Sequence, residues 1–326
     1  MIGNTKAFPL QLDKTIDKMF YNEWRRRQRY YTAIFKEEDA PRGADYTEAT
    51  ISELGLPREI GEGQGVEFDV PNEGNKVTRY YKKYGLGTQL TEEMIQDELH
   101  GKWKQIPPSL ADSMIERQEF LAASVLDGGF STVTGEDGNP LFYATHTTLK
   151  GGATIDNLLS GDLSTTTIQA AFSYGDTLVG ENGFIRPVRP VGIVCHPGNR
   201  WVIHEILKAE NRVFTYGDAD KGLIVTGSGD TPASTSMAAS GVNALNPLNP
   251  KYGLVSDWKV FLNPYLTDQD AWYVLFENYD LRAYWKKRPT LESSGDFYTG
   301  NKIYKTTMRG TFFSNKYKLI AGSAGV

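Results

Sequence analysis

Histidine and cysteine are the residues of this chain whose types could support catalysis or metal binding. Cys195-His196 is followed by His204-Glu205, and His146 stands apart from them. A thiol beside an imidazole can act as a nucleophile and its base, and the same two groups are common zinc ligands. These residues therefore allow a soluble, hydrolase-like enzyme that uses His146 or the cluster of Cys195, His196 and His204.

The surroundings of these residues favour a structural role. Cys195 closes an apolar run, where a free cysteine is usually a small buried hydrophobic residue. One thiol and two histidines are too few for a zinc site, and no carboxylate or second histidine stands at a useful spacing from His146. The sequence also lacks the motifs of phosphate loops, dinucleotide-binding folds, serine hydrolases and zinc proteases. We expect no catalytic, cofactor-binding or metal-binding residues, no cofactor, and a turn-stabilising hydrogen bond for His146.

The composition is that of an ordinary globular protein with an acidic balance. The 326 residues carry a net charge of −5, which argues against strong electrostatic binding of the whole protein to the phosphates of nucleic acid. The single cysteine excludes an intrachain disulfide. No apolar run reaches the roughly 20 residues that a membrane span needs, and the first residues lack the apolar centre of a signal peptide. We therefore expect synthesis in the cytosol and no membrane contact.

Residues 1–45 have the pattern of an N-terminal arm. A helix-like run over 14–35 places apolar residues on one face and contains a basic segment interleaved with tyrosines. The basic residues are Arg25, Arg26, Arg27 and Arg29. They could bind nucleic acid, or the arm could lie across an acidic partner surface; the acidic overall charge favours the second interpretation.

Residues 46–90 are predicted to form an extended, glycine-punctuated excursion. Strand-like pieces at 66–70 and 76–84 flank the turn-forming residues 71–75, which indicates a β-hairpin. The hairpin has too few residues of buried type for a core of its own, and a lone two-stranded ribbon is marginally stable in water. It needs a surface to lie on, and the next subunit is the obvious candidate.

A long amphipathic helix is predicted from Ser109 to the Gly128-Gly129 pair. Ser109 would be its N-cap, and the glycines would end it in the left-handed conformation. Glu119 and Phe120 fall on its polar face, where the aromatic ring needs another element or a neighbouring subunit to cover it. A shorter amphipathic piece at 91–103 precedes it.

The rest of the chain alternates helix, strand and loop signals. The pattern predicts a helix over 164–179 capped by Ser164 or Thr165, a strand–turn–helix unit over 191–210, and a surface loop over 214–250. Aromatic and β-branched runs predict strands within 252–266, 271–291 and 303–322.

The order of these parts resembles that of the major capsid proteins of tailed phages, which have the HK97 fold, and most closely the Mu-like major head subunit family. Three local patterns carry the resemblance, which covers about residue 50 to the C-terminus. They are the segment 84–93 with Asp97; Asp137-Gly138-Asn139-Pro140-Leu141-Phe142 followed by His146, Gly151-Gly152 and Asn157-Leu158; and Arg189-Pro190 with the strand 191–195 and Pro197. The segment 102–110 departs from the family pattern as an insertion.

The resemblance implies an α+β, HK97-like capsid fold. It implies an N-terminal arm over 1–45, an extended hairpin loop over 46–90, and a peripheral domain with a spine helix and a long sheet over 91–160 and 265–326. Residues 161–264 would form an axial domain. It further implies a structural protein, not an enzyme, that self-assembles into the hexamers and pentamers of an icosahedral shell.

The implied partners are other copies of the chain, a scaffolding protein, a portal and a decoration protein. Packaged double-stranded DNA would be enclosed without sequence-specific binding, and the protein would be made in the host bacterial cytoplasm and reside in the virion. A different phage structural or adhesion protein that forms a trimer or ring stays open as an alternative. Intersubunit contacts are expected from Arg25, Arg26, Arg27, Arg29, Glu67, Asp69, Lys76, Arg79, Tyr81 and Phe120.

Overall fold

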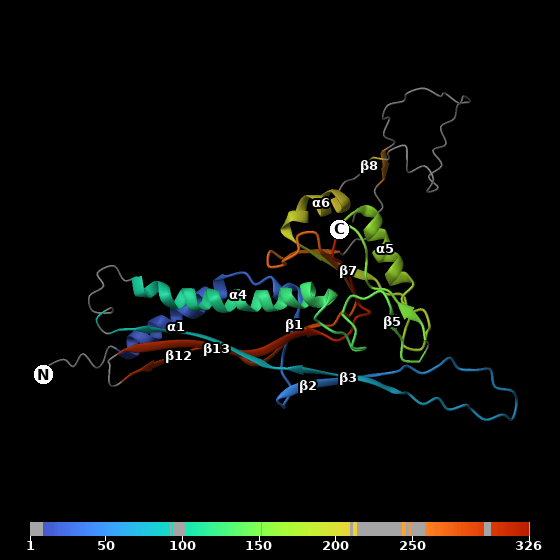
Figure 1. Ribbon diagram of the computed structural model, residues 1–326, viewed down its shortest axis with the longest axis horizontal. Helices are drawn as coiled ribbons and strands as arrows, with labels where there is room; N and C mark the ends of the chain where they lie inside the picture. Colours follow the sequence, from blue (N-terminus) through green and yellow to red (C-terminus); the bar gives the residue numbers. More distant parts are fainter. Residues whose placement is uncertain are drawn as a thin grey trace, which may run out of the picture.

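The computed structural model describes residues 9–91, 93, 102–150, 152–208, 211–213, 243–245, 248, 258–296 and 301–325. Most of the predicted amphipathic piece at 91–103, and most of the predicted loop over 214–250, lie outside the described residues. The remainder forms two layered α/β parts and a long projecting ribbon (Figure 1).

The first sheet is long and has four strands in the order β1-β12-β13-β4. β1 runs parallel to β12, and the other neighbours are antiparallel. The helices α4 and α1 lie along one face of this sheet (Figure 1). The elements are α1 (Pro9–Arg26), α2 (Tyr31–Ile34), β1 (Lys36–Asp39), β4 (Lys82–Leu90), α4 (Ile106–Asp127), β12 (Leu281–Gly295) and β13 (Lys302–Ser314).

The second sheet has the order β10-β7-β11-β14 and carries the helices α5 and α6 (Figure 1). Its elements are α5 (Thr165–Asp176), β7 (Pro190–Cys195), the 3-10 turn η4 (Pro197–Asn199), α6 (Arg200–Lys208), β10 (Lys259–Leu262), β11 (Trp272–Phe276) and β14 (Ile320–Ser323). The predicted strand–turn–helix unit is confirmed. The predicted cap is confirmed too, because Ser164 Oγ accepts the backbone N–H of Thr167 at 3.2 Å.

Short elements complete the described chain. They are two small antiparallel pairs and two further 3-10 turns. They are β5 (His146–Thr147) with β6 (Thr154–Ile155), β8 (Asn211–Val213) with β9 (Asn243–Leu245), η2 (Lys102–Gln105) and η3 (Gly128–Phe130).

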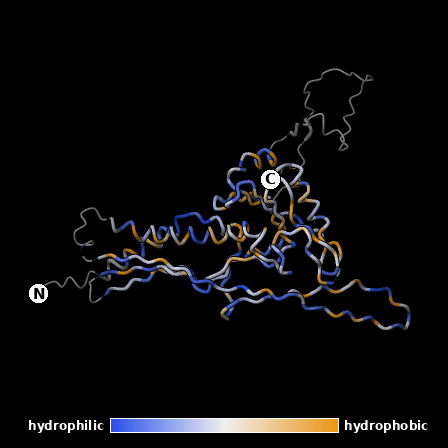
Figure 2. Tube along the Cα trace, in the orientation of Figure 1, coloured by the Kyte–Doolittle hydropathy of each residue, from blue (hydrophilic) through white to orange (hydrophobic). Residues whose placement is uncertain are grey.

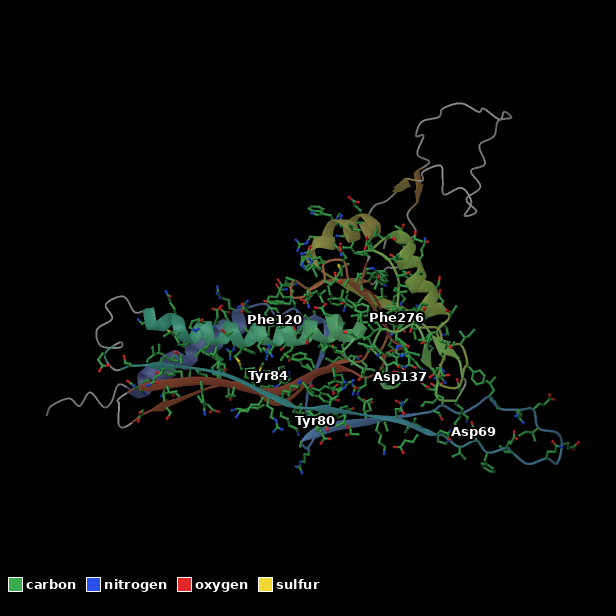
Figure 3. All side chains as sticks on the ribbon, in the orientation of Figure 1. Asp69, Tyr80, Tyr84, Phe120, Asp137 and Phe276 are labelled. Atoms are coloured by element: carbon green, nitrogen blue, oxygen red, sulfur yellow. The ribbon has the colours of Figure 1, made fainter. Side chains whose placement is uncertain are left out.

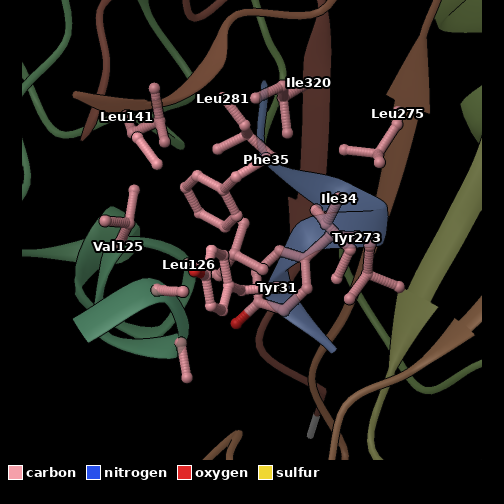
Figure 4. Close-up of a cluster of buried hydrophobic side chains, with 14 of the residues drawn as sticks. Tyr31, Ile34, Phe35, Val125, Leu126, Leu141, Tyr273, Leu275, Leu281 and Ile320 are labelled. Carbon is pink, nitrogen blue, oxygen red and sulfur yellow. The ribbon is translucent and has the colours of Figure 1, made fainter. Parts of the chain in front are cut away.

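One hydrophobic core joins the two sheets. Its fully buried side chains include residues of α2, α4, β11, β12 and β14, elements that are distant in the sequence (Figure 4). Tyr31 of α2, Leu126 of α4 and Tyr273 of β11 are each completely inaccessible or nearly so. The apolar face of α4 therefore packs against both sheets at once.

The long helix is present, but its ends differ from the prediction. α4 begins at Ile106, so Ser109 is not its N-cap; Pro107 and Pro108 lie in the first turn, where proline loses no helical hydrogen bond. The helix ends at Asp127 as expected. Gly128 has φ −74° and continues into η3, so the predicted left-handed cap is wrong.

The predicted pairing within the excursion is also wrong. β2 (Asp45–Ile51) pairs with β3 (Glu73–Tyr80), whereas 66–70 form no strand and 71–75 do not make the turn. Tyr46 packs against rings of the long sheet, so tertiary contacts select 45–51 as the partner strand. The residues from Lys82 onward form β4, the edge strand of the long sheet.

Glu119 lies buried in α4, not on its polar face as the helical pattern suggested. Its carboxylate accepts the backbone N–H groups of Tyr30 at 2.6 Å and Tyr31 at 3.1 Å. Burial raises the pKa of Glu119 to about 7, against the opposing effect of these two hydrogen bonds and of Arg29 and Arg27. The carboxyl group thereby ties the connection between α1 and β1 to the middle of α4.

Replacing Glu119 with Gln should remove part of the pH dependence of the free energy of unfolding. The folded pKa of about 7 exceeds the ordinary value of 4.5, so the wild-type protein loses stability as the pH rises between these values. This shift corresponds to about 3 kcal/mol. Denaturant unfolding of both proteins at about pH 5 and about pH 8 measures the difference. Identical pH dependences would contradict the assignment; the other carboxyl groups are common to both proteins.

Candidate interaction surfaces

Cys195 and its neighbouring histidines do not form a catalytic unit. The thiol is fully buried at the end of β7, and burial raises its pKa to about 12, so it is not available as a thiolate. His204 is exposed on α6, and Nδ1 of His196 accepts the backbone N–H of Gly198 at 3.0 Å. Within the described residues, no group of three His, Cys, Asp or Glu side chains could hold a metal ion.

His146 has a structural role within its own chain. Its Nδ1 lies 2.6 Å from Oδ2 of Asp137, and its ring stacks on Tyr317 with centroids 3.8 Å apart. Burial alone would raise the pKa of Asp137, but hydrogen bonds from His146 and Asn139 hold it below its usual value. The side chain of His146 is fully buried, so a substrate has no access to it. The hydrogen bond expected for His146 is confirmed.

Sequence reasoning missed Asp137 as the partner of His146. The two residues are nine positions apart, a spacing that corresponds to no helix or strand period. The Asp-Gly turn signal at 137–138 was the available clue, because aspartate in a turn often bonds a group a few residues away.

The loop 52–72, between β2 and β3, projects away from both layered parts (Figure 3). Its tip is a turn at Glu62-Gly63. Apolar residues recur along it (Figure 2), and their side chains are exposed, that of Phe68 to 93%. The exposed apolar residues are Leu54, Leu56, Ile60, Val66, Phe68 and Val70. Exposed apolar side chains gathered on one segment mark an interaction surface.

Polar contacts fix the base of this loop. Ser52 and Asn72 bond each other twice, each contact at 2.8 Å. Asp69 lies 2.5 Å from Nζ of Lys150 and accepts the N–H of Gly55 at 2.7 Å; the bond from Lys150 is the main reason that the pKa of Asp69 is lowered. The loop therefore leaves the body in a defined direction, although its tip touches little.

Arg79 and Tyr81 are engaged within the chain. Arg79 reaches from β3 to the body, where it donates to the carbonyl oxygens of Thr134 at 2.5 Å and Ser314 at 3.2 Å, and to Oδ1 of Asn315 at 3.0 Å. Tyr81, between β3 and β4, is buried in a cluster of aromatic rings. Both residues hold the ribbon against the long sheet.

The arm arginines divide into two groups. Arg27 lies 2.8 Å from Asp112 and 2.9 Å from Glu116, so the acidic surface that it crosses is α4 of its own chain. Arg29 lies over the ring of Trp24, 5.4 Å from its centre. Arg25 and Arg26 are exposed at the end of α1, where Arg26 pairs with Glu23 in the preceding turn.

Lys76, Glu67 and Phe120 are exposed. Lys76 and Glu67 make single surface ion pairs, with Glu73 at 3.3 Å and Arg58 at 3.2 Å, which contribute little to stability. Phe120 (labelled in Figure 3) is 54% exposed, and its ring meets that of Tyr265 edge to face, with the centroids 5.3 Å apart. An open groove of about 1080 Å³ adjoins both rings.

Comparison with known proteins identifies relatives of this chain. The sequence profile of a family described as phage capsid protein matches residues 78–312. None of the curated proteins is a significant match. No helix of the described residues is both long and apolar enough to cross a membrane.

Solved capsid structures share the fold at low sequence identity. The capsid of the native GTA particle is 10% identical, with 91% of this chain and 90% of that chain covered and a TM-score of 0.55. The mature capsid of bacteriophage PhiM1 is 9% identical, with 91% and 87% covered and a TM-score of 0.51. The virus-like particle from Pyrococcus furiosus is 8% identical, with 95% and 98% covered and a TM-score of 0.50.

Replacing Arg79 with Ala should destabilise the folded chain by about 2–3 kcal/mol, because two main-chain carbonyl groups and Asn315 lose their charged donor. The matched variant Lys76→Ala, on the same strand, removes only an exposed pair and should change stability by less than about 0.5 kcal/mol. Denaturant unfolding of the three proteins measures both effects. Equal losses for the two variants would show that Arg79 does not anchor the ribbon.

Proposed function

The chain belongs to the phage capsid protein family, and we propose that it is the major head subunit of a tailed phage, which self-assembles through hexamers and pentamers into an icosahedral shell. Its HK97-type fold supports the proposal. Within the family, the three local patterns at 84–97, 137–158 and 189–197 support the Mu-like major head subunits as its nearest group.

The exposed loop 52–72 is the observation that carries this proposal. Its base is fixed by Asp69, Ser52 and Asn72, yet six large apolar side chains along it remain in solvent. Burying such side chains stabilises an assembly by about 1.5–3 kcal/mol each. A neighbouring copy would cover them, and many such contacts repeated around a closed shell would resist the pressure of packaged DNA.

The same proposal assigns roles to the other segments. We propose an arm over 1–45, an extended loop region over 46–90, a peripheral domain over 91–160 and 265–326, and an axial domain over 161–264. The acidic net charge suits a wall that encloses double-stranded DNA without binding its sequence. Scaffolding, portal and decoration proteins would be its partners, the host bacterial cytoplasm its place of synthesis, and the virion its final location.

The expected contact residues fall into two groups under this proposal. The exposed ones can meet a neighbour directly: Arg25, Arg26, Glu67, Lys76 and Phe120. Those already engaged in the chain would act by holding the arm and the loop in the contacting orientation: Arg27, Arg29, Asp69, Arg79 and Tyr81.

The positions of Cys195, His146 and His204 do not support the alternative of a hydrolase-like enzyme. The thiol of Cys195 and the imidazole of His146 are both buried, and His204 is on the exposed side of α6. Membership of the capsid family favours a structural protein over a hydrolase.

Negative-stain electron microscopy of the full chain, expressed alone and with its scaffolding partner, tests the proposal. Closed shells, or hexamers and pentamers, are expected. The double variant Leu56→Ser/Phe68→Ser should leave the unfolding temperature unchanged, because both side chains are exposed in the subunit. It should reduce the yield of shells by about tenfold or more, because it removes apolar area from every contact.

The variant Gln64→Ser is the matched control, since it changes an exposed polar residue of the same loop. It should assemble as the wild-type protein does. A wild-type chain that stays monomeric under every condition, with the partner present, would overturn the proposed function. Normal shells from the double variant would show that the loop does not join the subunits.

A further inference from the structure

Among the described residues, helices cover only one of the two faces of the long sheet. Tyr84 of β4 faces α4, where Arg117 lies 4.9 Å over its ring, and Met308 of β13 faces α4 through a contact with Gln118. Because successive side chains in a strand point to opposite faces, Lys83 and Arg309 point away from the helices. We call this side of β12, β13 and β4 the open face.

Basic side chains line up across the open face. Lys83 is directly paired with Arg309, and Arg309 with Lys287, so three cations lie side by side on three neighbouring strands. Lys305 lies on the same face of β13, four residues before Arg309 and directly opposite Glu292. We call Lys83, Lys287, Lys305 and Arg309 the basic strip.

The charges of the basic strip are only partly compensated. Glu292 is 2.5 Å from Lys287 and 3.0 Å from Lys305, and the bonds from these two lysines lower its pKa to about 2. In the part of the chain that the structure describes, neither Lys83 nor Arg309 has an acidic partner. Like charges directly opposite each other destabilise a sheet, and an acidic partner on this face would offset that cost.

The projecting loop carries the opposite charge. Glu59 and Glu62, at its tip, are exposed and have no ion-pair partner among the described residues. Glu67 has only the exposed pair with Arg58. The tip is therefore acidic and apolar at once, whereas the open face is basic around Lys83. Gly85 and Gly87 follow Lys83 on this face and let another backbone approach.

The ribbon leaves the subunit on the side of the open face. Tyr46 of β2 packs against Tyr284 and Phe313, which alternate with the core-facing Trp285 and Phe312. Figure 1 shows β2 and β3 on the side of the long sheet opposite α4. Copies in a closed shell all present the same face outward, so a loop that projects in this layer meets the same layer of its neighbour.

We propose that the acidic tip of loop 52–72 in one copy docks on the basic strip of a second copy. The inference rests on the proposed function and adds to it the recognising residues: Glu59, Glu62 and Glu67 on the loop, and Lys83 and Arg309 at the centre of the strip. Opposite charges determine the position at which the loop binds the second copy. The exposed apolar side chains of the loop are then buried in that contact.

Charge exchange tests this docking. The variant Lys83→Glu/Arg309→Glu and the variant Glu59→Lys/Glu62→Lys should each lower the yield of closed shells by about tenfold, because like charges then meet in every contact. The variant with all four substitutions should recover assembly to within about twofold of wild type. Lys82→Glu is the matched control for Lys83→Glu, since it makes the same charge change at the neighbouring, opposite-facing position.

Disulfide trapping gives an independent readout. Assembled shells of Glu62→Cys/Arg309→Cys should form covalent multimers under an oxidant, while each single variant should not. Cys195 adds no background because its thiol is buried. Multimers confined to the double variant support the docking, and their absence from well-formed shells overturns it.

The remaining outcomes separate the two proposals. If the variant Lys83→Glu/Arg309→Glu forms shells at the wild-type level, the docking is overturned and the proposed function stays intact. If those shells also hold less DNA than wild-type shells, the basic strip contacts the nucleic acid instead. A wild-type chain that forms no shells overturns the proposed function, and this inference with it.

Discussion

A two-stranded ribbon cannot bury its own apolar side chains, and this constraint governs the rest of the structure. The loop 52–72 extends this ribbon without forming strands, so Phe68 and the other apolar side chains along it stay in water in the isolated chain. A stable subunit tolerates such a segment only if its remaining parts fold without it. The two sheets and α4 do so, because their shared core contains no residue of the loop.

The contacts at the base of the ribbon hold the exposed loop 52–72 in one orientation relative to the body. Arg79 holds β3 to main-chain oxygens of the body, and Asp69 is bound by Lys150. These bonds restrict the directions that the loop can take before it meets a partner. Because the loop is already held in one orientation within the subunit, it loses less conformational entropy when each contact of an assembly forms. Arg27 and Glu119 do the same for the arm, which they bind to α4.

Local signals in the sequence predicted the elements and their order, while contacts between distant residues decided the remainder. The Ser164 cap, the 191–210 unit, the end of α4 at Asp127 and the presence of a projecting excursion depend on neighbouring residues, and they could be predicted. The partner strand of β3 was predicted incorrectly, because the strand that contains Tyr46 is held in place by rings more than 200 positions away, those of Tyr284 and Phe313. Glu119 was misplaced for a related reason: its partners are the backbone N–H groups of Tyr30 and Tyr31 at the start of α2, which no helical pattern reveals.

The basic strip was equally invisible to the sequence, since its members come from three strands that meet only through the register of the sheet. The net charge of −5 is a sum over the whole chain and does not show that the surface around Lys83 and Arg309 is positively charged. Exposed charge pairs are individually weak and sensitive to salt, so they suit recognition better than permanent attachment. Weak, charge-guided contacts let a wrongly placed copy dissociate, whereas the apolar side chains of the loop stabilise the contact once its position is right.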